Sequence, residues 1–266
     1  MTKLVYIGGY GHSGSTLLEY FLTACQDVIA CGEVVNAKRE RSRTRKCSCG
    51  KIAERCPVWE RVFNLSSGSR NLSHQDLVLA LINQVSQRHT LLIDSSKTAW
   101  RHVATPFRIW HTLDHRFILV HIVRDPRAVN WSLLRRCERL GLQFNKTQIC
   151  LLTSLGWCLA NLACELFRWR APKNYRLIKY EDLARSPREE LTHLLRYLAP
   201  ERDCELNAIG SSDNRHQLYG NRMRCQQLSL TDIKDDDVWR THMPVRYRRM
   251  VTCLTWWLGR RYGYWD

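Results

Sequence analysis

The chain has 266 residues, of which 44% are hydrophobic and 25% are charged. This balance is typical of a globular protein with a sizeable core, and it excludes a disordered or fibrous chain. The net charge of +16 favours a polyanionic partner: nucleic acid, a membrane surface or a phosphorylated small molecule. No apolar stretch reaches the ~18–20 residues of a membrane span, and the N-terminus lacks the features of a signal peptide. We therefore expect a cytoplasmic protein without a membrane span.

Apolar segments in the first half of the chain predict alternating strands and helices. Residues 4–9 form a β-rich run, and a glycine- and serine-rich loop separates it from a helix striped by Leu17, Leu18 and Phe21. The polar, basic segment that follows has no clear period and is interpreted as an insert at about 34–63. A helix near 77–85 and a strand at 90–94 come next, from their 3.6-residue and continuous apolar patterns respectively.

The second half continues the alternation. A continuous apolar strand is predicted at 116–123, and Asp125 and Pro126 then provide the N-cap and first position of a helix. A long helix carries leucines from Leu151 to Leu166, a strand follows at 175–180, and a capping box at 186–189 opens another helix. Alternating strands and helices imply one α/β domain over 1–266, with a mostly parallel central sheet covered on both faces.

Twelve cysteines in a chain that is neither small nor visibly secreted favour reduced thiols over disulfides. Three of them, Cys47, Cys49 and Cys56, lie together in the basic insert. They could hold zinc if a fourth ligand came from elsewhere in the chain, but their spacing matches no standard zinc finger. The alternative is a local turn stabilised by packing, and we assign no metal ligand.

The loop at Gly9–Thr16 carries the most specific chemical signal. Glycines let the backbone wrap an anion, and the N-terminus of the following helix offers unpaired N–H groups to it. The spacing is that of a Walker A phosphate loop, except that Ser15 stands where the lysine belongs. Such a loop can hold a 5′-phosphate but is poorly equipped to activate a γ-phosphate. This argues against a kinase or NTPase and for another nucleotide-like donor.

On these residues the chain resembles the sulfotransferase family, which uses 3′-phosphoadenosine 5′-phosphosulfate (PAPS) as co-substrate. The resemblance covers nearly the whole chain and implies a P-loop-like three-layer α/β/α fold. A late match, HQLYGNRMR at His216–Arg224, is familiar from bacterial members. The resemblance otherwise rests on GYGHSGSTLL at Gly9–Leu18, CGE at Cys31–Glu33, IVRDPRAVNWS at Ile122–Ser132 and KYEDLARSPREEL at Lys179–Leu191.

The resemblance implies a set of PAPS contacts. Arg124 and Ser132, eight positions apart, would bind the 3′-phosphate, although Arg124 alone could instead form a salt bridge at the edge of the sheet. Tyr180 would lie near adenine, or could be a core aromatic at the end of a strand. The late loop that closes over the cofactor would supply Arg222 and Arg224. The 5′-phosphosulfate would lie on Gly11, His12, Ser13, Gly14, Ser15 and Thr16.

Three residues are candidates for the catalytic roles. Glu33 matches the glutamate of the Cys-Gly-Glu segment in the protein-tyrosine sulfotransferase branch, where it is the base; a surface glutamate paired with Lys38 or Arg39 is the alternative. Lys97 resembles the lysine that other members place beside the leaving oxygen. His12 stands where many relatives have lysine or arginine, and we expect bound donor to raise its pKa above ~6.5.

His102 is a second, weaker candidate for the base, in what we interpret as an apolar helix. The resulting hypothesis is an enzyme that transfers a sulfonyl group from PAPS to a hydroxyl of a small-molecule or carbohydrate acceptor, without requiring a metal. A P-loop-type kinase or NTPase is the alternative, and a basic nucleic-acid-binding protein is a further one. The sequence does not choose among a sugar, a phenol, an alcohol and a peptidyl tyrosine as acceptor, nor does it indicate an oligomeric state.

Overall fold

The computed structural model describes residues 1–38, 42–65, 72–201, 212–233 and 237–265, and it centres on a five-stranded parallel sheet. The strands lie in the order β2-β3-β1-β4-β5. The chain runs from β1 to β2 and β3 on one side of β1, and it then crosses to β4 and β5 on the other side. The carboxyl end of β1 is therefore a topological switch point, the place where open α/β sheets bind ligands. The bounds are β1 Lys3–Gly8, β2 Val28–Ala30, β3 Leu91–Asp94, β4 Phe117–Val123 and β5 Tyr175–Lys179.

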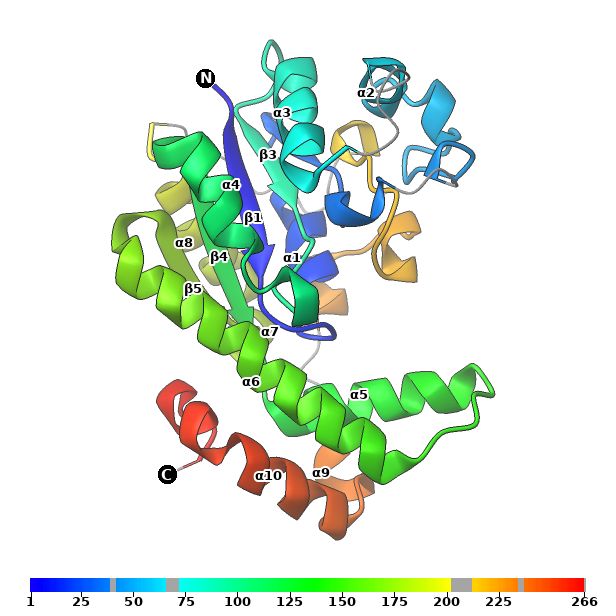
Figure 1. The fold of residues 1–266 in the computed structure, drawn as a ribbon, viewed down its shortest axis with the longest axis vertical. Coiled ribbons are helices and arrows are strands. Elements are labelled where there is room, and N and C mark those ends of the chain that lie inside the picture. The colour runs from blue at the N-terminus through cyan, green and yellow to red at the C-terminus, as the bar shows by residue number, and fades with distance from the viewer. Residues whose placement is uncertain (39–41, 66–71, 202–211, 234–236, 266) are drawn as a thin grey trace.

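Helices cover both faces of this sheet, which confirms the predicted three-layer arrangement (Figure 1). Alternate strand residues point to opposite faces. Val5 and Ile7 pack toward α1 (Ser15–Leu22), α7 (Tyr180–Arg185) and α8 (Pro187–Leu198). Leu4 and Tyr6 pack toward α3 (His74–Val85), α4 (Thr105–Leu113) and the C-terminal part of α6 (Lys146–Arg170). Strict alternation along β1 thus supplies one hydrophobic core for each face.

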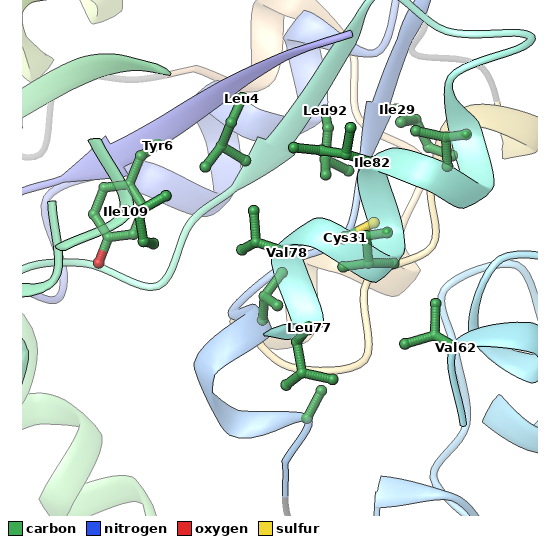
Figure 2. Close-up of a cluster of buried hydrophobic side chains, with 14 of the residues drawn as sticks. Leu4, Tyr6, Ile29, Cys31, Val62, Leu77, Val78, Ile82, Leu92 and Ile109 are labelled. Carbon is green, nitrogen blue, oxygen red and sulfur yellow. The ribbon is translucent and has the colours of Figure 1, made fainter. Parts of the chain in front are cut away.

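Figure 2 shows how α3 closes the second of these cores. Leu77, Val78 and Ile82 lie against Leu4 and Leu92 of the sheet, and all five side chains are almost fully buried. Burial of one such side chain contributes about 1.5–3 kcal/mol. Helix α2 (Trp59–Leu65), which belongs to the predicted insert, joins the same cluster through its buried aromatic and aliphatic residues. The insert is therefore packed onto the core, although its boundaries were read only as an aperiodic segment.

Four helices form a separate layer beyond the carboxyl ends of the strands (Figure 1). They are α5 (Pro126–Arg139), the N-terminal part of α6, α9 (Val238–His242) and α10 (Val245–Gly259). The predicted start of α5 is confirmed, because the Asp125 side chain accepts a hydrogen bond from the N–H of Arg127 and Pro126 opens the helix. Helices α9 and α10 were not predicted.

Helix α6 is confirmed as a long helix, but its leucines lie on the outside. The leucines predicted from Leu151 to Leu166 are exposed, whereas the buried face carries small, polar and aromatic residues such as Trp157, Ala160 and Asn161. The expectation that no apolar stretch reaches the length of a membrane span is wrong for α6, which is long and apolar enough to cross a membrane, although half of its apolar window is buried inside the structure. Core helices of proteins share these properties, so they do not by themselves make α6 a membrane span.

Four local predictions are wrong. Ser186 precedes α8 without any side-chain cap, because its backbone lies outside the extended conformation of an N-cap. His102 lies in a short 3₁₀ turn (Trp100–His102), not in an apolar helix. The short strand β2 was missed. Among the described cysteines, ten have free thiols and Cys25 is disulfide-bonded, so reduced thiols are wrong at Cys25.

One buried histidine makes stability depend on pH. His121 of β4 is fully buried, with Nδ1 2.7 Å from the Tyr175 hydroxyl and Nε2 2.7 Å from the Asn161 side-chain oxygen. Burial lowers the pKa of His121 from 6.5 to about 4. Because the unfolded chain binds this proton near pH 6.5 and the folded chain does not, stability is lost as pH falls through the window from 6.5 to about 4.

We expect His121 to contribute a loss of about 2 kcal/mol in unfolding free energy between pH 7.5 and pH 5. Urea unfolding of wild type and His121→Gln at both pH values measures this. The variant should be less stable at pH 7.5 but should lose about 2 kcal/mol less on acidification. Burial raises the pKa of Glu19 to about 7, so Glu19 adds a pH dependence of the opposite sign. This contribution is the same in wild type and variant, so it cancels in the difference between their unfolding free energies. Equal losses in both proteins would contradict the assignment.

Candidate active site

Two glycines let the loop between β1 and α1 pack closely against its neighbours, because a side chain at either position would clash with them. Gly9 and Gly14 have φ angles of 115° and 91°. A Cβ on Gly9 would lie 2.3 Å from the carbonyl oxygen of Ile122, and one on Gly14 would lie 2.5 Å from the Tyr180 ring. Gly11 has open space where a Cβ would be. The close contacts thus place the loop directly over the end of β4.

One buried polar group inside this loop has no hydrogen-bond partner in the part of the chain that the structure describes. Ser13 is buried, and its hydroxyl oxygen makes no hydrogen bond within the described residues. Ser15 and Thr16 are also buried, and α1 begins at Ser15 without a side-chain cap. A buried, unsatisfied hydroxyl beside an uncapped helix N-terminus costs free energy unless a ligand binds there. This donor set fits a phosphate or sulfonyl group.

Arg124, at the end of β4, packs against the same loop. Its guanidinium lies 4.3 Å from the centre of the Tyr180 ring, and Nη1 donates to the carbonyl of His12 at 3.1 Å. The Tyr180 ring thus contacts both Gly14 and Arg124. Tyr180 is buried in the core and is the first residue of α7, directly after β5, so it lies beneath the loop as well as in the core.

Ser132 meets the loop from the second turn of α5. Its hydroxyl lies 3.0 Å from Nδ1 of His12, so the structure brings Arg124 and Ser132 to the same loop residue. The pKa of His12 is lowered from 6.5 to about 4, first by burial and then by the charges of Arg136 and Lys97. His12 is therefore neutral near pH 7 in this state.

Glu33 and Lys97 form an ion pair beside the loop. The other carboxylate oxygen of Glu33 accepts a hydrogen bond from the Asn36 amide at 2.8 Å. Lys97 has a φ of 67°, a left-handed conformation that is uncommon outside glycine, and the Tyr6 hydroxyl donates to its carbonyl. The neighbouring Thr98 N–H donates to the Gly9 carbonyl at 3.1 Å. The Lys97 segment is thus fastened to the phosphate loop, and Glu33 pairs with Lys97.

The late basic loop that carries Arg222 and Arg224 also contacts the phosphate loop. The N–H of Asn221 donates to the Thr16 hydroxyl at 3.4 Å, immediately before a 3₁₀ turn over Arg222–Cys225. Arg222 is exposed, whereas Nε of Arg224 is buried without a hydrogen-bond partner among the described residues. Four distant segments that carry predicted cofactor residues therefore meet at the carboxyl ends of β1 and β4, the last of them through the backbone of Asn221.

Residues 5–203 match a family model described as "Sulfotransferase family". The chain belongs to this sulfotransferase family. A search of curated proteins returned no match. Among solved structures, the fold is similar to the sulfotransferase domain from the curacin biosynthetic pathway, with a TM-score of 0.63 and 21% identity over 97% of this chain and 98% of that one. A mouse sulfotransferase complexed with PAP has a TM-score of 0.54 and 12% identity, over 95% and 81% of the chains. Retinol dehydratase in complex with retinol and PAP has a TM-score of 0.51 and 11% identity, over 96% of this chain and 80% of that one.

A buried carboxylate that was not predicted from the sequence holds the backbone just before Glu33 in this sulfotransferase. Glu19 of α1 is 1% exposed and accepts hydrogen bonds from the Gly32 N–H at 2.7 Å and the Ser95 hydroxyl at 2.8 Å. It thus joins the segment before Glu33 to the segment before Lys97. The signal was visible, since Glu19 is a lone charge in the apolar run STLLEYFL.

A second buried pair lies next to the sulfotransferase site. Asp94, at the end of β3, is fully buried and lies 2.6 Å from Nε2 of His74. The Asp94 carboxylate also accepts from the N–H of Val34, so it helps to hold the backbone that carries Glu33. His102 lies near this pair, and its pKa is lowered by burial and by the charge of His74. His102 is thus grouped with His74, and Glu33 is the carboxylate that faces Lys97.

Proposed function

We propose that this sulfotransferase transfers a sulfonyl group from PAPS to a hydroxyl of a small-molecule or carbohydrate acceptor, without a metal in the transfer step. The observation that carries the donor assignment is the buried, unsatisfied Ser13 hydroxyl in a phosphate loop that contacts Arg124 and Ser132 through His12. Two structures of similar fold were solved with PAP, which supports the assignment. We place the enzyme in the cytoplasm.

In this proposal the loop residues and α1 bind the 5′-phosphosulfate, while Arg124 and Ser132 bind the 3′-phosphate. A guanidinium can donate two parallel hydrogen bonds to a phosphate, which suits Arg124 to the more highly charged end. Tyr180 keeps the Arg124 guanidinium in place by stacking beneath it. Arg222 and Arg224 close the donor side from the late loop, whose backbone contacts Thr16.

PAPS supplies the electrophilic sulfur and the departing phosphate. As the acceptor oxygen attacks sulfur, its proton passes to the Glu33 carboxylate and the bond from sulfur to the 5′-phosphate oxygen breaks. Lys97 stabilises the negative charge that develops on that oxygen. We infer that the Glu33–Lys97 ion pair is the resting state, because the two groups must separate to serve the two ends of an in-line displacement.

We propose that Tyr10 and Trp100, rather than the nearby Phe107 and Trp110, bound the acceptor side. Phe107 and Trp110 pack edge-on against Phe167 in the core. Tyr10 and Trp100 instead close over Gly156, where a Cβ would lie 2.6 Å and 2.9 Å from their rings. We propose this aromatic wall as the acceptor surface, which favours an acceptor with an apolar or planar face.

Calorimetry with PAP, and with ATP in the presence and absence of magnesium, tests the proposal. We expect PAP to bind without magnesium, and ATP to bind more weakly because it lacks the 3′-phosphate. Turnover is then measured with PAPS and a panel of sugars, phenols and aliphatic alcohols. Tight magnesium-dependent ATP binding with no binding of PAP would overturn the donor assignment. PAP binding without sulfation of any hydroxyl would overturn the acceptor assignment.

Arg124→Ala is expected to weaken PAPS binding by about 2–4 kcal/mol, the scale for loss of a charge-assisted pair. The loss should be smaller for adenosine 5′-phosphosulfate, which lacks the 3′-phosphate, although not zero because Arg124 also binds the loop backbone. Ser132→Ala should show the same selectivity at about 1 kcal/mol. Equal losses for both donors would show that Arg124 acts only on the loop.

A further inference from the structure

Three cysteines of the insert and one histidine of the late loop form a compact group away from the phosphate loop. Cys47, Cys49 and Cys56 come from one short segment, and His216 joins them across 160 residues of chain. The four potential ligand atoms all lie within 4.8 Å of one another, and three of the four residues are buried. We propose that this group binds a structural zinc ion, a function separate from sulfonyl transfer.

The distances are those of a tetrahedral site. Zinc–sulfur bonds of ~2.3 Å make the sulfur–sulfur edge of a tetrahedron about 3.8 Å. The Cys49 and Cys56 sulfurs are 3.8 Å apart, and those of Cys56 and Cys47 are 3.7 Å apart. Nδ1 of His216 lies 3.2 Å from the Cys56 sulfur. A disulfide would bring two sulfurs to ~2.05 Å, so the thiols converge without bonding to each other.

The outer contacts of His216 suit a metal ligand. Its second ring nitrogen, Nε2, lies 3.0 Å from the carbonyl oxygen of Asp213, and a carbonyl can only accept. Nε2 therefore carries a proton that it donates to this carbonyl, and Nδ1 faces the Cys56 sulfur, free to bind a metal ion in the neutral tautomer. Metal-binding histidines are fixed in this way by a hydrogen bond from the other nitrogen. Three thiolates and one neutral imidazole, with no open position, are a structural zinc donor set.

The local backbone is shaped to present the sulfurs. Cys47 and Cys49 flank a tight turn that closes at Gly50, whose φ of 89° favours glycine, and the Gly50 N–H donates to the Cys47 carbonyl at 3.0 Å. An antiparallel bridge between Lys46 and Ile52 closes the turn. The sequence showed the three thiols, but their spacing could not reveal His216, because the fourth ligand comes from a different segment.

The proposed ion would hold the insert to the loop that reaches the active site. Beyond His216, the Tyr219 hydroxyl lies 2.8 Å from the Ser42 hydroxyl, and the Tyr219 carbonyl accepts from the N–H of Glu33 at 3.2 Å. Two residues later, Asn221 contacts Thr16. The ion would thus tie together two segments distant in sequence, one of which continues to Glu33 and Thr16 through Tyr219 and Asn221.

Elemental analysis of the full chain, purified without chelators, tests the site directly. We expect about one zinc per chain in wild type and in Cys253→Ser, which removes an exposed thiol on α10. Cys49→Ser should lose most of the metal, and Cys49→His should keep it. Cobalt exchanged into wild type should give the visible spectrum of a tetrahedral thiolate site.

A folded wild-type protein with no zinc and no tetrahedral cobalt spectrum would overturn the proposal, as would equal zinc loss in Cys49→Ser and Cys253→Ser. If Cys49→Ser does not fold, thiol titration of wild type decides. Three additional thiols should become reactive when a chelator removes the metal, and unchanged reactivity would contradict the site. None of these readouts depends on PAPS, so their failure is distinct from failure of the proposed function.

A second inference comes from α6, independently of the metal site. Between Leu151 and Leu166, every exposed residue of this helix is a leucine. Apart from Leu151, the exposed residues recur at alternating intervals of three and four, the spacing of a helix-pairing seam. A helix that faces a membrane has a broad apolar face, whereas the exposed apolar stripe of α6 is narrow. The narrow stripe favours pairing with another helix over contact with a membrane. The seam consists of Leu152, Leu155, Leu159, Leu162, Leu166 and Trp169.

We infer that this seam pairs with the same seam of a second copy of the chain, in antiparallel orientation. The spacing is symmetric about the midpoint of the seam, so a two-fold axis there would bring Leu159 against Leu162 of the second copy. Antiparallel pairing separates the two copies of Arg168 and Arg170 and aligns the helix dipoles favourably. The exposed apolar area is on the order of 600 Å² per chain, large for a monomer. Two copies would bury about 1,200 Å², the lower range of specific interfaces.

Sedimentation velocity over a concentration series tests the pairing. Wild type should form a dimer, Leu159→Glu should be monomeric, and Val238→Glu, on an exposed site of α9, should remain dimeric. Mixing Leu155→Cys with Leu166→Cys should give a disulfide-linked heterodimer under oxidation. A wild type that stays monomeric, including one that instead floats with anionic lipid vesicles, would overturn the proposal.

Discussion

Glu33→Gln is expected to lower turnover by about 10²–10⁴-fold, the usual contribution of a general base. Glutamine keeps the shape and can still accept a hydrogen bond from Lys97, but it cannot take the acceptor's proton. PAP affinity should stay nearly unchanged, because the proposed donor contacts lie on the loop, Arg124 and Ser132. The measurement is single-turnover sulfation of the best acceptor, with PAP binding measured in parallel.

Glu60→Gln, at an exposed position of α2, is the matched control and should have wild-type turnover. Turnover of Glu33→Gln within a few-fold of wild type would move the base elsewhere, with His102 as the next candidate. Loss of PAP binding in Glu33→Gln would point instead to a structural role, since the backbone of Glu33 also bonds to Tyr219.

Glu19→Gln separates positioning from chemistry at the same site. Glu19 holds the Gly32 N–H and the Ser95 hydroxyl beneath Glu33 and Lys97. Burial raises its pKa to about 7, so the protonated and charged forms are both accessible near neutral pH. We expect Glu19→Gln to lower turnover less than Glu33→Gln and to change the pH profile near pH 7. A profile identical to that of wild type would show that Glu19 only fills space.

The sequence predicted the parts of this site whose chemistry is local. The phosphate loop is specified by its own glycines, and Asp125 and Pro126 begin α5 by contacts within three residues. The sequence did not predict partners that lie far apart along the chain. His216 joins the cysteine cluster across 160 residues, and nothing near Cys47 indicates this. The face of α6 was also not predictable, because leucine periodicity shows that a stripe exists but not whether it faces inward.

Lys97→Met and His12→Asn are expected to separate the two candidates for the leaving-group cation. Both residues have left-handed backbone conformations, with φ angles of 67° for Lys97 and 65° for His12, so each replacement must tolerate that conformation. Asparagine tolerates this conformation and can still meet the Ser132 hydroxyl. Methionine keeps the length of Lys97 and removes only its charge.

The structure favours Lys97. His12 is buried among cations and has a pKa of about 4, so protonating it near pH 7 costs about 4 kcal/mol that bound donor would have to supply. Lys97 already carries its charge, in the ion pair with Glu33. Nδ1 of His12 is also engaged by the Ser132 hydroxyl at 3.0 Å, on the proposed 3′-phosphate side.

We therefore expect Lys97→Met to lower turnover by about 10²–10³-fold, the scale for removing one transition-state donor. His12→Asn should lower turnover by less than about tenfold, through weaker support of Ser132. Turnover between pH 5.5 and pH 9 should not follow a histidine titration in wild type. If His12→Asn is the inactive variant, and turnover falls above pH 7 in wild type, Lys97→Met and Glu19→Gln alike, the donor has raised the pKa of His12 and the histidine is the cation.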